Sequence, residues 1–390
     1  MSSVHMLELP DDCLYYIFNY LEAEDRLKFA QVCHRFKQVF VAKLRKKYCD
    51  YSLELKCQRL ELLEFSMCRE IVERLSINLA YFELYEVHPI NISLKLFHIV
   101  CGSSLDMENL RYLIVHDPTG RVQTVEKPFE QILMAVAHLG QLKRLEIHAK
   151  AECSLENLSQ LKHLEELQLH LPHIEASTLS KCCQSNSNLR VLYLQYNCVK
   201  RNLKQIVPHC KNLEVLTFGM AAEASDFKPL ANLPKLKELT HSGIRKSGSF
   251  QPLLRALANK SQLERLVISG VSLNMQEAEE IVQIDSLVKL KCFCSSIQCV
   301  EMLAKVSKLE ELCLWMSTSE DITHALLKIV INCTNLKLLF LAGGHVQRDF
   351  VGQVQKLKVG RMLKLQIPFV QQQLNEECTK VNKLNKWTEF

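Results

Sequence analysis

The stretch SEDITHALLKIVINCTNLKLL, residues 319–339, combines a helical pattern with the start of a strand pattern. Ile322, Leu326 and Ile329 follow an acidic, Ser-rich start at the spacing of one helix face. From Leu336 onward the spacing changes, and apolar residues lie two apart, as on one face of a short strand. The stretch therefore predicts a structural unit made of one helix and one strand.

The pattern L-x-x-L-x-L that begins at residue 336 recurs along the chain. Successive starts are 22 to 32 residues apart and mostly fall within the period typical of leucine-rich repeats. One such unit cannot bury its apolar side alone, so the units should stack. We expect an α/β fold in which a curved solenoid has parallel strands on its concave face and helices on its convex face. The eleven clear occurrences start at residues 79, 110, 142, 164, 189, 213, 236, 263, 287, 309 and 336, and weaker candidates at 60 and 362 should cap the stack.

Composition and charge narrow the class of protein. Of the 390 residues, 48% are hydrophobic and 23% charged, which is typical of a folded soluble chain. The 48 basic and 43 acidic side chains are too evenly mixed to indicate a nucleic-acid partner. No apolar run is long enough to span a membrane and no signal peptide is evident, so we expect no membrane partner and a cytoplasmic or nuclear location.

The 17 cysteines should be reduced in such a location and should act as small buried apolar residues. No C-x-x-C pair occurs, and the closest clusters lack the spacing of a zinc site. We therefore predict no metal and no cofactor. Phosphate-binding loops, nucleophile elbows and H-E-x-x-H helices are also missing, so catalysis by this chain is not expected.

The N-terminal stretch ELPDDCLYYIFNYLEAEDRLKFAQVCHRFKQVF, residues 8–40, predicts three short helices. In the first of them, Leu14, Ile17, Phe18 and Leu21 form one apolar stripe. So short a segment has little interior of its own, because small folds bury a small share of their surface.

Three tyrosines in the same stretch, Tyr15, Tyr16 and Tyr20, lie largely off this stripe. Even the folded helices should therefore leave an apolar face exposed. Because exposed apolar patches usually mark interaction sites, we expect another protein to cover it. The alternative is that these helices only cap the first repeat.

This stretch resembles the F-box family over about 40 residues without a gap. It departs from the family at Arg26, where Leu is common, and at Phe36, where Trp is common. Cys210 and Cys333, each three residues before a strand, further resemble the cysteine-containing repeats typical of F-box proteins. The residues that carry the F-box resemblance are Leu9, Pro10, Asp12, Leu14, Ile17, Tyr20, Leu21, Asp25, Leu27 and Val32 to Phe36.

The resemblance implies that a Skp-type adaptor covers the helices and links them to a cullin and a RING subunit. The chain would then be the non-catalytic, substrate-recognition subunit of an SCF-type E3 ubiquitin ligase. The alternative is a repeat scaffold or inhibitor outside any ligase, which a buried, unpartnered charge at Arg26 would favour. A third class, an enzyme with its own Cys nucleophile, would need a thiol with a depressed pKa. The adaptor-binding residues that the resemblance implies are Leu9, Pro10, Leu14, Ile17, Phe18, Leu21, Leu27, Val32, Cys33 and Phe36.

The domain organisation follows from these assignments. Residues 1–48 should be the F-box and residues 79–370 the repeats, about eleven clear units with degenerate caps. Residues 49–78 should connect the two modules or cap the solenoid, and they are too apolar for a flexible linker. Residues 371–390 remain as a C-terminal tail.

The third, fifth and seventh positions of each strand should face the concave side, since alternate residues point opposite ways. In the seventh position, His116, His148 and His170 stand in register on strands roughly 4.8 Å apart. Metal ligation or a pH-dependent contact is geometrically possible there. The simplest interpretation is exposed histidines without a special role, and a polar contact to a substrate is the second.

The later repeats place aromatic residues on the same face, and aromatic side chains are frequent anchors of interfaces. Arg265 and Lys291 stand nearby and could meet an acidic or phosphorylated segment. The alternatives are that the C-terminal tail covers these aromatics or that the strand register shifts. His241, in a position normally taken by buried Leu, should be a structural irregularity that needs a hydrogen-bond partner. The candidate substrate-binding residues are His116, His148, His170, Tyr193, Arg265, Lys291, Phe293, Trp315 and Phe340.

Overall fold

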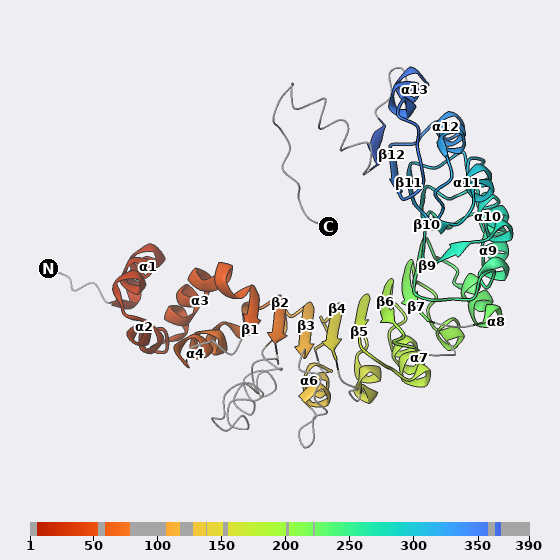
Figure 1. Cartoon of the computed structure of the whole chain (residues 1–390). Helices are drawn as coiled ribbons and strands as arrows, with labels where there is room; N and C mark the ends of the chain where they lie inside the picture. Colours follow the sequence, from red (N-terminus) through yellow and green to blue (C-terminus); the bar gives the residue numbers. More distant parts are fainter. Residues whose placement is uncertain are drawn as a thin grey trace. The chain divides into compact units, whose positions relative to one another are not determined.

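The structure is a computed structural model of the chain, shown in Figure 1, and it forms two compact units. The first consists of residues 1–198 and 208–212, and the second of residues 199–207 and 213–390. No helix in the described part of the chain is long and apolar enough to cross a membrane. The structure describes residues 6–53, 59–78, 107–117, 128–137, 139–150, 155–199, 203–220, 223–357 and 363–367.

The first unit begins with the three expected helices. They pack around an aromatic core in which Phe18 lies 5.1 Å from Phe29 and 5.4 Å from Phe40, measured between ring centroids. Phe36 closes this cluster, 4.6 Å from Phe29. These helices are α1 (Asp11–Tyr20), α2 (Ala23–Ala30) and α3 (His34–Tyr48), after a 3-10 turn η1 (Met6–Glu8).

The rest of the first unit consists of parallel strands that pair in sequence order, with helices or 3-10 turns between them. The predicted stack of helix–strand repeats is thus confirmed. In order, the elements are β1 (Asp50–Leu53), α4 (Arg59–Cys68), η2 (Arg69–Ile71), β2 (Arg74–Asn78), β3 (Tyr112–Asp117), α6 (Pro128–Val136), β4 (Arg144–Ala149), η5 (Glu156–Gln160), β5 (Glu166–His170), α7 (Ala176–Ser185) and β6 (Val191–Tyr196).

The first two strands differ from the sequence-based expectation. The strand expected at residue 79 lies outside the described residues, and β2, which the repeat pattern did not predict, pairs directly with β3. The apolar spacing of β2 is Val72-x-x-Leu75-x-Ile77, a version of the repeat pattern without a leading Leu. The weak candidate at residue 60 was wrong, because residues 59–68 form the helix α4.

A buried polar cluster joins the N-terminal helices to the first repeat. The Tyr48 hydroxyl, at the end of α3, donates a hydrogen bond of 2.7 Å to Glu64 Oε2 on α4. Lys47 Nζ donates to the same oxygen at 2.9 Å. Burial, followed by this hydrogen bond, raises the pKa of Tyr48, which therefore stays protonated. The Phe65 ring stacks on Tyr51 of β1 at 4.9 Å, so apolar packing surrounds the cluster.

The second unit continues the same pattern of parallel strands in sequence order. Neighbouring helices α9 to α12 contact one another in series on one side of the strands (Figure 1). Its elements are η6 (Leu203–Ile206), β7 (Val215–Gly219), α8 (Ala224–Phe227), η7 (Lys228–Asn232), β8 (Glu238–Ser242), α9 (Gln251–Ala258), β9 (Arg265–Leu273), α10 (Met275–Val282), β10 (Lys289–Cys294), α11 (Ile297–Leu303), β11 (Glu311–Met316), α12 (Thr323–Asn332), β12 (Leu338–Ala342), α13 (Phe350–Leu357) and β13 (Lys364–Gln366).

Most of the described strands bury alternate side chains toward the helices. In β4, Leu145 and Ile147 are fully buried, whereas Glu146 and His148, which alternate with them, are half-exposed. We call the side of the strands that faces away from the helices the strand face. It carries the third, fifth and seventh positions of the repeat pattern, as the sequence predicts.

Polar groups before the strands link successive repeats. Buried Asn186, at the end of α7, accepts a hydrogen bond of 2.8 Å from the Leu164 backbone N–H and donates one to the Leu161 carbonyl. Cys333 occupies the same place after α12, and its Sγ contacts the Val306 carbonyl at 3.3 Å. Asn186 thus takes the place that Cys has in the repeats ending at Cys210 and Cys333, and it too bonds the preceding repeat.

A completely buried ion pair stabilises the second unit. Arg245 contacts both carboxylate oxygens of Glu277, at 2.6 and 3.1 Å, and neither side chain is exposed to solvent. Glu277 also accepts a hydrogen bond from the Phe250 backbone N–H at 3.1 Å and belongs to the capping box at the start of α10. Removing one partner would leave the other charge buried and uncompensated.

His241 of β8 lies in the same region and is 1% exposed. Its ring lies 4.9 to 5.7 Å from those of Phe218, Phe227 and Phe250. Nε2 lies 3.3 Å from the Met220 carbonyl, and within the described chain Nδ1 has no hydrogen-bond partner. Burial lowers the pKa of His241 to about 4, so the ring is neutral at pH 7.

We predict that Glu277→Ala destabilises the second unit by about 3–5 kcal/mol, the usual cost of leaving one member of a buried ion pair alone. The matched control is Glu280→Ala on the same helix. Glu280 lies 2.6 Å from Arg255, whose side chain is largely exposed. Urea unfolding of the full chain measures both. Equal midpoints for the two variants would contradict the stabilising role of the buried pair.

We also predict that His241 makes the protein acid-sensitive. The unfolded chain binds a proton near pH 6.5 and the folded chain only near pH 4, so stability is lost as the pH falls between these values. His241→Leu should remove about 3 kcal/mol of that loss. Unfolding midpoints of both proteins from pH 7 to pH 4 test this, and parallel pH profiles would contradict it.

Candidate functional sites

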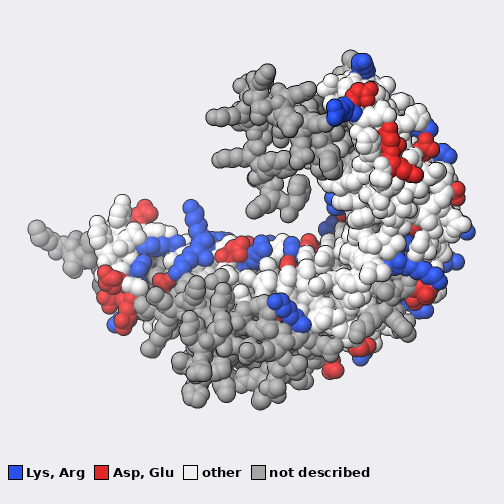
Figure 2. All heavy atoms as spheres, viewed as in Figure 1, with Lys and Arg blue, Asp and Glu red and all other residues white. Residues whose placement is uncertain are grey.

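The N-terminal helices expose an apolar surface. Tyr20 is 86% exposed, Tyr16 67% and Val32 65%. Of the fourteen large apolar side chains exposed in the described part of the chain, six lie between Met6 and Val32, so the exposed apolar surface is concentrated on this domain. Acidic and basic side chains both lie on the surface of the same helices (Figure 2). An apolar patch with a charged rim is suited to binding another protein.

The expected adaptor-binding residues divide into two groups. Leu14, Phe18, Leu27 and Phe36 are buried within the helical domain, so they form its core and are not available to a partner in this structure. The sequence could not separate these roles, because core and contact residues share one helical stripe. The remaining six are exposed or half-exposed: Leu9, Pro10, Ile17, Leu21, Val32 and Cys33.

Arg35 positions the segment before α1, a role that the sequence did not indicate. Its guanidinium bonds Asp11 at 2.7 Å and the Leu9 carbonyl at 2.5 Å, and it also contacts the Leu7 carbonyl. These contacts order the chain on both sides of Pro10. The stretch 32–36, which resembles the F-box family, therefore includes Arg35, a side chain that holds the segment around Pro10 in place.

Arg26, where the sequence departs from the F-box pattern, is only half-buried. Its Nε is shielded from solvent and makes no hydrogen bond within the described chain. Burial, and then the nearby Arg26 charge, lower the pKa of Lys43. Arg26 thus lies at the surface beside another cation, and a partner with acidic groups there would relieve the repulsion between them.

The predicted histidine column is present on the strand face of the first unit. His116, His148 and His170 are paired in register on β3, β4 and β5. Their rings stack, with centroids 4.4 Å apart for the first pair and 4.0 Å for the second, and the Tyr193 ring continues the stack 4.6 Å from His170. All four side chains are half-exposed.

Glu146 adds an acid to this column, which the sequence did not single out. Its Oε1 lies 2.7 Å from His148 Nε2, and its Oε2 lies 3.1 Å from the Arg144 guanidinium. Partial burial opposes ionisation of Glu146, but the bonds with His148 and Arg144 outweigh it and lower the pKa of the carboxyl. Partial burial and then repulsion from His148 lower the pKa values of His116 and His170, so both are neutral at pH 7.

The predicted aromatic residues also meet on the strand face of the second unit. Trp315 lies between Phe293 and Phe340, with both centroid distances 5.3 Å. The register is the expected one, since Phe293 pairs with Trp315 across β10 and β11. All three rings are half-exposed. We call these three residues the aromatic ladder.

Basic groups flank the aromatic ladder. Arg265 is paired with Glu238 at 3.2 Å, and Lys289 with Glu311 at 2.8 Å. Lys291 is half-exposed. Burial raises the pKa of Cys313, and the nearby positive charge of Lys291 offsets part of this increase. The C-terminal tail, which the sequence left as a possible cover for these rings, lies outside the described residues.

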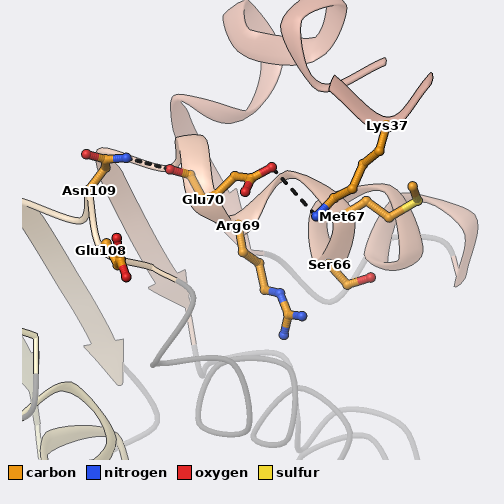
Figure 3. A pocket seen from close by; sticks show the side chains of 7 residues that line it. All are labelled: Lys37, Ser66, Met67, Arg69, Glu70, Glu108 and Asn109. Atoms are coloured by element: carbon orange, nitrogen blue, oxygen red, sulfur yellow. Dashed lines mark hydrogen bonds and ion pairs between the residues drawn. The ribbon is translucent and has the colours of Figure 1, made fainter. Parts of the chain in front are cut away.

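A cavity of about 290 Å³ lies in the first unit, where the N-terminal helices meet the repeats (Figure 3). Charged and polar residues both line it. The Glu70 carboxylate lies 3.7 Å from Lys37 Nζ, and the Glu70 backbone carbonyl accepts a hydrogen bond of 2.7 Å from the Asn109 side chain. The cavity could not be predicted from the sequence, because its lining residues come from segments far apart in the chain. The lining residues are Lys37, Ser66, Met67, Arg69, Glu70, Glu108 and Asn109.

Burial disfavours the thiolate form of several described cysteines. Burial raises the pKa of Cys68 and of Cys182 to about 12. Every described cysteine whose pKa departs clearly from its usual value has it raised, and a raised pKa suppresses the reactive thiolate. These thiols belong to the core rather than to a catalytic site.

Comparison with known proteins defines the class of this chain. Residues 6–47 match the F-box domain family, which places an F-box domain on the three N-terminal helices and confirms the resemblance. The residues that follow form leucine-rich repeats by their own periodicity and strand pairing. The chain therefore carries an F-box domain at residues 6–47 followed by leucine-rich repeats.

Two solved structures are similar over most of their length. One is an internalin from Listeria monocytogenes, 15% identical, covering 89% of this chain and 90% of that chain with a TM-score of 0.49. The other is a leucine-rich-repeat protein from Leptospira interrogans, 13% identical, covering 87% and 97% with a TM-score of 0.42. No curated protein sequence matches the chain.

Proposed function

We propose that this chain is the substrate-recognition subunit of an SCF-type E3 ubiquitin ligase. The observation that carries the proposal is the F-box domain at residues 6–47 with its exposed apolar surface, attached to a repeat array of the kind that binds other proteins. F-box domains generally bind Skp-type adaptors. The adaptor would connect the chain to a cullin and a RING subunit, and those partners would carry out ubiquitin transfer.

The adaptor surface that we propose consists of the F-box residues that remain accessible. Pro10 and Val32 are exposed, and Leu9, Ile17, Leu21 and Cys33 are half-exposed. Tyr20 extends the apolar area at the end of α1. The buried phenylalanines hold the three helices together beneath this surface. Covering these side chains with an adaptor would remove apolar area from water, which is the main driving force of such association.

The target surface that we propose is the strand face of the second unit, centred on the aromatic ladder. Large aromatic side chains contribute a disproportionate share of interface energy. Lys291 adds positive charge beside the rings and suits an acidic or phosphorylated target segment. The role of this chain would be to hold the target near the ubiquitin donor, which raises the effective concentration of the reacting groups.

The second candidate function is a repeat scaffold outside any ligase. Arg26 is the residue that favours it, because a charge at a usually apolar position weakens an apolar contact. Its half-exposed position reduces that cost, since the guanidinium keeps contact with solvent. The ligase role therefore has the stronger support.

We predict that Val32→Arg weakens binding to a Skp-type adaptor by at least roughly tenfold, because it places an unpaired charge in an apolar interface. The matched control is Ile331→Arg on α12, which is also exposed, at 54%, but lies outside the F-box. The affinity of purified full-length protein for the adaptor is measured by calorimetry.

The ligase role requires that the intact chain binds the adaptor and that only Val32→Arg weakens binding. Equal weakening by Ile331→Arg would place the contact elsewhere. Failure of the intact chain to bind would leave the repeat scaffold as the function.

We predict that Trp315→Ala removes target binding, with a loss of at least about 2 kcal/mol, as expected for a central aromatic anchor. Ile244→Ala is the control, since Ile244 is 66% exposed in the same unit but not on a strand. Both are made in the Val32→Arg background, so that captured targets are not degraded. Quantitative mass spectrometry should find proteins lost with Trp315→Ala and retained with Ile244→Ala; identical sets would contradict the proposed target surface.

A further inference from the structure

The histidine column contains the donor set of a transition-metal site. His148 and Glu146 belong to β4, two residues apart and therefore on one face, and His170 is the in-register neighbour on β5. One ligand atom from each of these three side chains lies within 4.8 Å of the others. We propose that Glu146, His148 and His170 bind a Zn²⁺ ion on the strand face of the first unit.

The chemistry of the donors favours zinc over the hard cations. Two imidazole nitrogens and one carboxylate oxygen are a common zinc ligand set, with a fourth position left for water. Calcium and magnesium prefer oxygen donors and would gain little from two histidines. The three residues belong neither to the proposed adaptor surface nor to the aromatic ladder, so the site does not depend on the proposed ligase role.

Binding requires a small rearrangement of the side chains. The His148 and His170 rings are stacked with only 6° between their planes, so their nitrogen lone pairs do not converge on one point. Each ring must turn about its Cβ–Cγ bond to place a nitrogen about 2.0–2.1 Å from the ion. Both side chains are half-exposed, which leaves space on the solvent side for this rotation.

An existing contact joins two of the proposed ligands. Glu146 Oε1 lies 2.7 Å from His148 Nε2. The ion would take the place of the proton shared in this bond.

Two charged residues beside the three proposed ligands affect the charge of the site and the orientation of Glu146. Arg144 binds Glu146 Oε2 at 3.1 Å and Glu166 Oε2 at 3.4 Å. Its charge opposes a cation, but Glu166 compensates for it. The contact also orients the carboxylate so that Oε1 remains directed at His148, as outer-sphere partners commonly do at metal sites.

Another histidine provides a matched control. His173 Nε2 lies 2.7 Å from Glu175 Oε1, the same distance as in the His148–Glu146 pair. Among the described residues, this second pair belongs to no cluster of three ligand atoms. A simple His–Glu pair should therefore not bind zinc, whereas the three-donor cluster should.

The test is titration of the full-length, chelator-treated protein with Zn²⁺ against a chromophoric chelator, with Co²⁺ as a spectroscopic probe. Wild type and His173→Gln should bind one more equivalent of zinc than His148→Gln and His170→Gln, or bind it at least about tenfold more tightly. The Co²⁺ spectrum should lack a thiolate charge-transfer band, which excludes the cysteines as ligands.

Two outcomes would overturn the proposal. One is equal zinc binding by wild type, His148→Gln and His170→Gln, and the other is an equal loss with His173→Gln. Glu146→Gln keeps the shape and the polar character of the carboxylate while removing its charge, so it provides a variant that should fold. It should also weaken binding, and thermal melting followed by circular dichroism confirms that each variant is folded.

Discussion

Every part of this fold depends on the fact that one helix–strand unit cannot bury its apolar face alone. Leu312 and Leu314 are buried because the register places them beside Leu339 and Leu341 of the next strand. The backbone follows the same dependence, since the Lys337 N–H bonds the Glu310 carbonyl of the preceding repeat. An array built this way needs cover where it begins. In the first unit, α3 contacts β1 and provides that cover, so the F-box helices also support the repeats.

Periodicity alone predicted the repeats from residue 110 onward, because their leucines occupy buried positions that alternate with exposed ones. It failed at the first two strands, where Tyr51 and Val72 replace the leucines of the pattern. The resemblance to the F-box family supplied the residues of the F-box but not their roles. Phe18 and Val32 are both apolar members of the family pattern, yet one is buried and the other 65% exposed. The way in which the three helices pack against one another determines which apolar residues of each helix are buried.

Periodicity also does not predict ion pairs between residues that are far apart in the sequence. Arg245 and Glu277 are 32 residues apart, and nothing in either local sequence indicates a buried ion pair. Positions on the strand face were easier to predict, since register brings the same repeat position of neighbouring strands together. The stacked histidines and the Phe293–Trp315 pair follow from it, whereas Phe340 is in register with Cys313 and contacts Trp315 diagonally. Glu146 was missed because its contact with His148 depends on side-chain rotation rather than on register.

The junction between α3 and β1 determines how the F-box and the first repeats can act on each other. Helix α3 ends at Tyr48 and strand β1 begins at Asp50, so a single residue separates them, and the Tyr48–Glu64 hydrogen bond braces the corner. A tether would let the two modules sample many distances, at a cost that depends on its length. Here a single residue takes the place of a tether, and side-chain contacts of α3 with α4 fill the corner. Lengthening this corner would therefore change the distance between the F-box and the first strands without changing either binding surface.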